Sequence, residues 1–145
     1  MATENEREAL AAKFEHHADE EGKILAQYRM LAEQLGDSSA GTLVSHILTE
    51  EEMHHLLLRT MAKWLREPAA SPAGAVPASA DRAELLRVTR MLRQHERETI
   101  DACRRLKSQL SAGSAGLLGP LLEAMMLDSE KHHRLLEAAE ELLEG

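Results

Sequence analysis

Glutamates and histidines at helical spacing are the residues of this sequence best suited to chemistry. Glu51 and His54 are three positions apart, so both side chains would lie on one face of an α-helix. Glu21, Glu96 and His132 each occupy the middle of another stretch in which apolar residues recur every three or four positions. Carboxylate oxygens and imidazole nitrogens are ligands for iron, manganese and zinc. The pattern therefore predicts a metal site.

These five residues fall on faces that the apolar pattern predicts to be buried. A carboxylate in an apolar core costs several kcal/mol unless it is paired, protonated or bound to a cation. For a single residue, a hydrogen-bonded structural role is the simpler interpretation. Glu21 lies about as far before the first predicted turn as Glu51 lies after it. Glu96 and His132 have the same relation to the last turn, so all five would meet at one level of a helical bundle, which favours metal binding.

Four long segments with apolar residues at helical spacing would position these groups. We expect helices near residues 4–36, 39–67, 81–111 and 115–144. The breaks at 36–41 and 111–116 are short and contain Gly and Ser, residue types that end one helix and cap the next. Each of these breaks therefore predicts an antiparallel helical hairpin.

The middle connection, residues 68–80, is longer and rich in proline. Proline-rich chain extends about 3.1 Å per residue, so this linker would span roughly 40 Å, the length of a helix of about 28 residues. It would then run the height of a bundle and make the second and third helices parallel. A disordered join between two hairpins is the alternative. We expect residues 1–145 to form one all-α domain, a four-helix bundle of two antiparallel hairpins joined by a crossover connection.

The composition indicates a helical core of aliphatic side chains, and the net charge makes some classes of binding partner unexpected. Of 145 residues only 2% are aromatic, and the formal net charge is −8. This charge repels phosphate backbones and anionic lipid, so neither nucleic acid nor a membrane is an expected partner. Cys103 is the only cysteine, and neither a membrane-spanning run nor a signal-like N-terminus is apparent. A cytoplasmic location is expected.

The joint placement of these motifs resembles the ferritin-like superfamily, in particular its rubrerythrin-like diiron carboxylate proteins. That family carries Glu on the first helix, Glu-x-x-His on the second, Glu on the third and Glu-x-x-His on the fourth. Glu21 matches the first position and is followed by Tyr28, as is common in the family. Glu51-x-x-His54 matches the second position and Glu96 the third. The resemblance covers the whole chain and implies the same bundle with a crossover.

The fourth position departs from the family's pattern. The chain looks internally duplicated, and aligning its halves places Ser129 opposite Glu51 and His132 opposite His54. The fourth carboxylate is then absent or is supplied by Asp128. This departure puts a full, symmetric diiron site in doubt.

A literal Glu-x-x-His motif does exist one position later, as Glu130 and His133. Turning this pair inward would bring Glu140 towards the core and turn Met125 away from it. Hydrophobic periodicity therefore favours His132 as the ligand.

Other polar residues near the predicted site have secondary roles. His17 lies one turn before Glu21, and it is either an extra ligand, a partner that orients a carboxylate, or a histidine at the edge of the core. His55 and His133 are expected to make interhelical polar contacts. Cys103 is expected to be a buried thiol.

The resemblance implies a protein that binds iron as two ions, or as one ion given Ser129, with manganese or zinc as alternatives. It leaves open an oxidase or peroxidase activity in which dioxygen or hydrogen peroxide reacts at metal bridged by Glu21 and Glu96. His54 and His132 would be terminal ligands. The sequence has no pair of Cys-x-x-Cys motifs, so electrons would come from an external donor. The alternative is a bundle with a degenerate or single-metal site that acts as a structural or interaction module.

Several apolar residues fall outside the predicted core faces, namely Leu48, Leu56, Trp64, Met30 and Leu127. Scattered exposed apolar residues are common, but these residues would also suit burial against a second subunit. We expect a homodimer.

Overall fold

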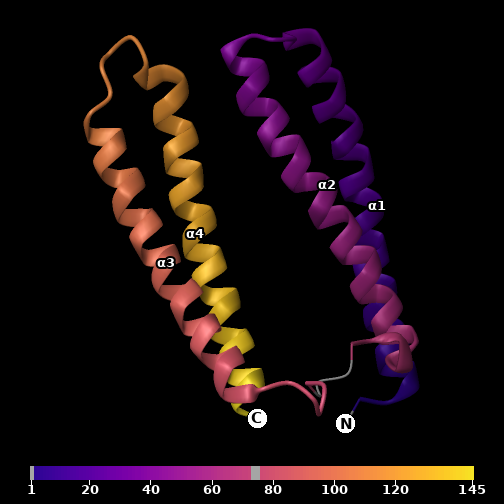
Figure 1. The fold of residues 1–145 in the computed structure, drawn as a ribbon. Helices are drawn as coiled ribbons and strands as arrows, with labels where there is room; N and C mark the ends of the chain where they lie inside the picture. Colours follow the sequence, from indigo (N-terminus) through magenta and orange to yellow (C-terminus); the bar gives the residue numbers. More distant parts are fainter. Residues whose placement is uncertain (1, 73–75) are drawn as a thin grey trace. The chain divides into compact units, whose positions relative to one another are not determined.

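The computed structural model describes residues 2–72 and 76–145 (Figure 1). The chain divides into two compact units, Met1–Ala73 and Gly74–Gly145, and each unit is a hairpin of two long helices packed along their lengths. Within the described ranges every regular element is helical. The all-α class and the two hairpins are thus confirmed, while their union in one bundle stays a prediction.

The first hairpin consists of α1, Glu4–Leu35, and α2, Ser39–Arg66. Thr3 begins α1 with a capping box, in which its hydroxyl accepts a hydrogen bond from the Glu6 amide. The Glu6 carboxylate in return accepts from the Thr3 amide. Two orphan amides at the start of α1 are satisfied in this way, which fixes where the helix begins.

The turn between α1 and α2 depends on two glycines. Gly36 has φ of +55°, a left-handed conformation that favours glycine. A Cβ atom at Gly41 would collide with the Gly36 carbonyl oxygen. Ser38 caps α2 by accepting a hydrogen bond from the Gly41 amide at 3.0 Å. The close approach at this turn explains why glycine stands inside the first turn of α2.

Small side chains fill the seam between α1 and α2. The buried apolar residues of this seam are Ala11, Ala18, Leu25 and Ala62. Short side chains allow two helices to pack closely. Near the C-terminal end of α2, the Arg66 guanidinium bonds Glu8 at 2.9 Å and also contacts Glu15, both on α1. These contacts fix the register of the pair.

The second hairpin consists of α3, Arg82–Ser108, and α4, Ala115–Glu144. Asp81 caps α3 by accepting a hydrogen bond from the Glu84 amide at 3.2 Å. The third helix ends three residues earlier than the predicted 81–111. The cause is that the amides of Gln109 and Leu110 bond carbonyls three residues back, a tighter winding than the α-helix.

The predicted linker at 68–80 is not extended throughout. Pro68–Ala70 forms one 3₁₀ turn, and the Ala80 amide donates to the Pro77 carbonyl at 2.9 Å. Residues 73–75 of this linker lie outside the described ranges. The crossover stays a prediction.

Each hairpin leaves large apolar side chains exposed. In the first hairpin these include Leu10 and Ile47, and in the second Leu85, Leu92, Leu106, Leu118 and Met125. Each hairpin therefore covers only part of its own apolar surface. Among the helices of the described ranges, none has a stretch both long and apolar enough to cross a bilayer.

Candidate metal centre

The first hairpin brings three of the predicted ligands together. Glu21 of α1 and Glu51 and His54 of α2 each offer one ligand atom, and these atoms all lie within 4.8 Å of one another. Within the group, His54 Nδ1 is 3.6 Å from Glu51 Oε1. Two oxygens and one nitrogen at this separation suit one divalent transition-metal ion.

The charge state of this cluster fits a cation. Burial raises the pKa of Glu51 above its usual value, and the neighbouring Glu21 raises it further, by hydrogen bonding and by its negative charge. His54 acts in the opposite direction. Two carboxylates held this close favour a shared proton or a bound cation over two full negative charges. The donor set therefore fits a metal both in atom type and in charge.

The cluster opens onto a shallow depression in the surface of the first hairpin. The residues that line it are His17, Glu20, Glu21, Ile24, Tyr28 and Glu51. His17 is exposed, and it lies beside two of the candidate ligands without being part of their compact group. Tyr28 is half-buried at the other end of the depression. Both side chains would border any small molecule that reaches a metal held by Glu21 and Glu51.

The second hairpin pairs two further predicted ligands. His132 Nδ1 of α4 lies 3.5 Å from Glu96 Oε1 of α3. At the position that corresponds to Glu51, Ser129 is only 5% exposed and contributes a hydroxyl instead of a carboxylate. Asp128, the other candidate for the fourth carboxylate, is 3.4 Å from the Lys131 ammonium. The second hairpin thus offers two ligands where the first offers three.

The alternative motif of Glu130 and His133 does not form a ligand pair, because His133 contacts Arg97 and Glu137 instead. His133 Nε2 accepts a hydrogen bond from Arg97 Nε of α3 at 2.9 Å, and His133 Nδ1 lies 3.3 Å from Glu137. Both ring nitrogens are therefore engaged, and Glu130 is exposed. His133 makes an interhelical polar contact, which leaves His132 as the histidine that accompanies Glu96.

His55 is the counterpart of His133 in the first hairpin. Its Nε2 accepts a hydrogen bond from Arg59 at 3.1 Å, and Arg59 also reaches Asp19 of α1 at 3.3 Å. Within the described ranges, the buried Nδ1 of His55 has no hydrogen-bond partner. His55 thus acts in the seam between α1 and α2 through an arginine on its own helix.

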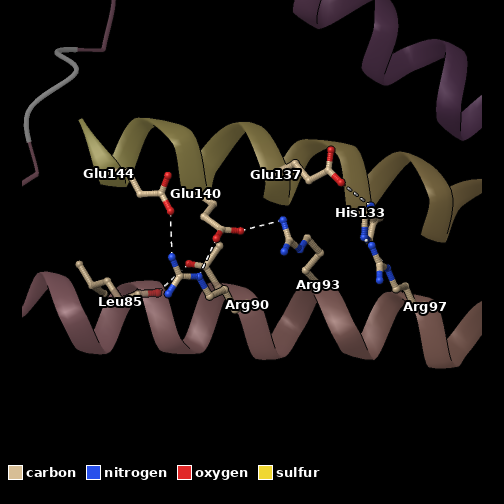
Figure 2. Close-up of polar contacts among 9 residues, drawn as sticks. Leu85, Arg90, Arg93, Arg97, His133, Glu137, Glu140 and Glu144 are labelled. Carbon is tan, nitrogen blue, oxygen red and sulfur yellow. Dashed lines mark hydrogen bonds and ion pairs between the residues drawn. The ribbon is translucent and has the colours of Figure 1, made fainter.

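Glu140 of α4 is a buried carboxylate between α3 and α4. The apolar pattern of the sequence predicts that this residue faces away from the core. Glu140 is 8% exposed, and Figure 2 shows Arg90 and Arg93 of α3 reaching towards it. The distances are 2.6 Å from Arg90 Nε and 2.8 Å from Arg93, and Arg90 also bonds Glu144 at 2.8 Å. Because the arginines neutralise Glu140, this site has no need of a metal. In the sequence, Arg90 and Arg93 are three positions apart and therefore share one face of a helix, which could have indicated a buried carboxylate on the facing helix.

Each hairpin has an interhelical ion pair at equivalent positions, but the acidic and basic residues are on opposite helices in the two hairpins. Shifting α1 by the 75 positions that separate Glu21 from Glu96 places Glu15 on Arg90. Shifting α2 by the 78 positions that separate His54 from His132 places Arg66 on Glu144. The Glu15 to Arg66 ion pair of the first hairpin is therefore the Arg90 to Glu144 ion pair of the second with its signs reversed. One interhelical ion pair of each hairpin thus occupies equivalent positions.

The first hairpin thus contains a compact ligand group, and the second contains a pair beside a buried serine. Comparisons of the chain with protein-family models, with curated proteins and with solved structures find no match.

Proposed function

We propose that the chain is a metal-binding helical protein whose primary site is formed by Glu21, Glu51 and His54. The observation that carries this proposal is the gathering of their three ligand atoms within 4.8 Å. The raised pKa of Glu51 supports it, because a divalent cation would relieve the repulsion between the two carboxylates.

The proposal includes association of the two hairpins through their apolar faces. Ile47 is 40% exposed and lies seven positions before His54, on the same side of α2. Met125 is 49% exposed and lies seven positions before His132 on α4. Covering these side chains would bury the candidate ligands along with them, in the manner of a four-helix bundle. Glu96 and His132 would then supply ligands for a second, weaker position.

The resemblance to ferritin-like diiron proteins suggests the chemistry. Iron bound at such a centre supplies redox reactivity towards dioxygen or hydrogen peroxide, with electrons from an external donor. Glu21 and Glu51 would neutralise the charge of the ion, and His54 would add a nitrogen ligand. Tyr28 and His17 border the depression beside the ligands, where they would contact an incoming small molecule.

Metal titration tests this proposal. We expect the purified, chelator-treated protein to bind ferrous iron or Mn²⁺, measured by calorimetry and by elemental analysis after dialysis. Glu51→Gln should weaken binding at least tenfold, which corresponds to about 1.4 kcal/mol. Glu33→Gln is the control, because Glu33 is an exposed residue of α1 outside the ligand group. A melting temperature that responds neither to these ions nor to chelator would refute the proposal.

A second candidate is a structural or interaction module, and the second hairpin favours it. Ser129 replaces a carboxylate there, and arginines neutralise the buried Glu140. A chain with only this role would keep its fold and its partners when Glu51 and His54 are replaced. Metal content of the protein as isolated separates the two candidates.

A further inference from the structure

The side of α2 that faces away from the candidate ligands carries an exposed apolar stripe. Met53 is 54% exposed and Leu56 is 58% exposed. Thr60 and Trp64 continue the row at intervals of four residues, and both are half-exposed. At about 100° per residue, Leu56 points some 160° away from His54 around the helix. The outer stripe of α2 comprises Glu52, Met53, Leu56, Thr60, Lys63 and Trp64.

The Thr60 hydroxyl, at the centre of this stripe, does not oppose burial of the apolar residues beside it. The Thr60 hydroxyl donates a hydrogen bond to the Leu56 carbonyl at 2.8 Å, so it needs no partner from water. Burying a hydroxyl that is already bonded avoids most of the cost of desolvation. The centre of the stripe is therefore suited to a dry contact.

The stripe is complementary to itself when two copies run antiparallel. Met53 and Trp64 are eleven positions apart on one flank, and Glu52 and Lys63 are eleven positions apart on the other, a rise of about 16 Å in each case. A twofold axis near residue 58 would set the Met53 of one copy beside the Trp64 of the other. It would also set Leu56 beside Thr60 of the other copy.

The charges on the second flank agree with the same axis. A twofold axis perpendicular to both helices brings each flank against the equivalent flank of the other copy, so Glu52 would face Lys63 twice. Within the described ranges Lys63 makes no ion pair, and Glu52 has only an exposed contact of 3.5 Å with Arg29. Both groups are available for a contact between copies.

We propose that the protein forms a homodimer through an antiparallel, twofold pairing of the outer stripes of two α2 helices. The occupant of the stripe is a second copy of this chain, because apolar and charged positions both match under one axis. The surface lies on the opposite side of α2 from the candidate ligands, so the dimer does not depend on metal binding.

Sedimentation velocity of the full chain, with and without chelator, tests this proposal. We expect a species of about twice the chain mass of 16.1 kDa. Leu56→Glu should weaken the dimer about a hundredfold or more, because it places two carboxylates beside the axis. Leu142→Glu is the matched control, since Leu142 is at least as exposed, lies on α4 and is outside the stripe.

Charge exchange identifies the pairing itself. Glu52→Lys or Lys63→Glu alone should weaken the dimer about tenfold by creating like-charge contacts, and the two together should restore it. Both positions are exposed, so circular dichroism should show unchanged folding. The proposal is overturned by a monomer at every concentration, by a dimer that tolerates Leu56→Glu, or by a double variant that fails to recover.

Discussion

Glu51 is a partly buried carboxyl whose ionised form is disfavoured by its surroundings in the folded chain. Burial and the adjacent Glu21 raise its pKa, so the folded state favours the protonated carboxyl more than the unfolded chain does. Stability should therefore fall as pH rises from the usual pKa of a glutamate through the raised value. A bound cation would remove this loss, because it stabilises both carboxylates in their charged form.

Glu51→Gln should accordingly stabilise the metal-free protein at neutral pH and flatten this pH dependence. The expected gain is about 0.5–1 kcal/mol, the size of one like-charge contact at a partly exposed site. Trp64 lies in the first hairpin, so its fluorescence during urea unfolding reports the stability of that unit. Glu33→Gln should leave the profile unchanged, and an equal gain in that control would contradict the explanation.

Replacing Gly22 or Gly41 of the first hairpin by alanine should change the free energy of unfolding in opposite directions. At Gly41 a new Cβ would meet the Gly36 carbonyl oxygen, so Gly41→Ala should destabilise by about 1–3 kcal/mol. At Gly22 the nearest atom would be His55 Cε1 at 3.5 Å, an ordinary contact. Gly22→Ala should stabilise the middle of α1 by about 0.5–1 kcal/mol. Urea unfolding of both variants measures the contrast, and the same sign in both would contradict the packing described at the turn.

Arginine-carboxylate ion pairs join the helices of both hairpins, but only the second hairpin buries the carboxylate. Glu140 of α4 is 8% exposed between Arg90 and Arg93 of α3, whereas the carboxylates that pair with Arg66 in the first hairpin are exposed or half-buried. The bond from Arg90 lowers the pKa of Glu140 against the effect of burial, and the charge of Arg93 lowers it further. This contribution to stability is present above the usual pKa of a glutamate and is lost as pH falls through the lowered value.

Glu140→Gln should therefore lower the melting temperature at neutral pH by several degrees and reduce the loss of stability in acid. The physical reason is that Arg90 and Arg93 would both lose their ion pair with the buried Glu140, and Arg90 would keep only its contact with Glu144. Glu141→Gln, at an exposed position of α4, is the control. Melting followed by circular dichroism between pH 3 and pH 7, a range of about four units around the ordinary glutamate pKa, checks the expectation. Equal effects of the two variants would contradict it.

The elements were largely predictable from the sequence, and the contacts of the charged residues were not. Helical spacing located the four helices and placed Glu21, Glu51 and His54 on adjoining faces, because this information is local. The sequence interpretation turned Glu140 outward because it placed Met125 and His132 on the inward face of the fourth helix, and Glu140 lies on another face. The burial of Glu140 depends on Arg90 and Arg93 of α3. The spacing of apolar residues within α4 gives no information about residues of another helix.

At the scale of the whole molecule, the halves of the chain differ in how many ligands they offer. Ser129→Glu would give the second hairpin a carboxylate at the position that corresponds to Glu51, beside the pair of Glu96 and His132. We expect metal content to rise from about one ion per chain towards two, as in paired carboxylate sites of helical bundles. Elemental analysis after dialysis measures this content. Ser129→Gln has a similar shape without the charge and should not raise it.

The exchanged ion pairs set a limit on how this chain can be rearranged by recombination. A chimera that joins α1 to α4 would bring Glu15 against Glu144, and its reciprocal product would bring Arg90 against Arg66. Both products place like charges at the contact that fixes helix register. Whole hairpins are therefore the units in which the gene can be cut, duplicated or grafted, and single helices are not.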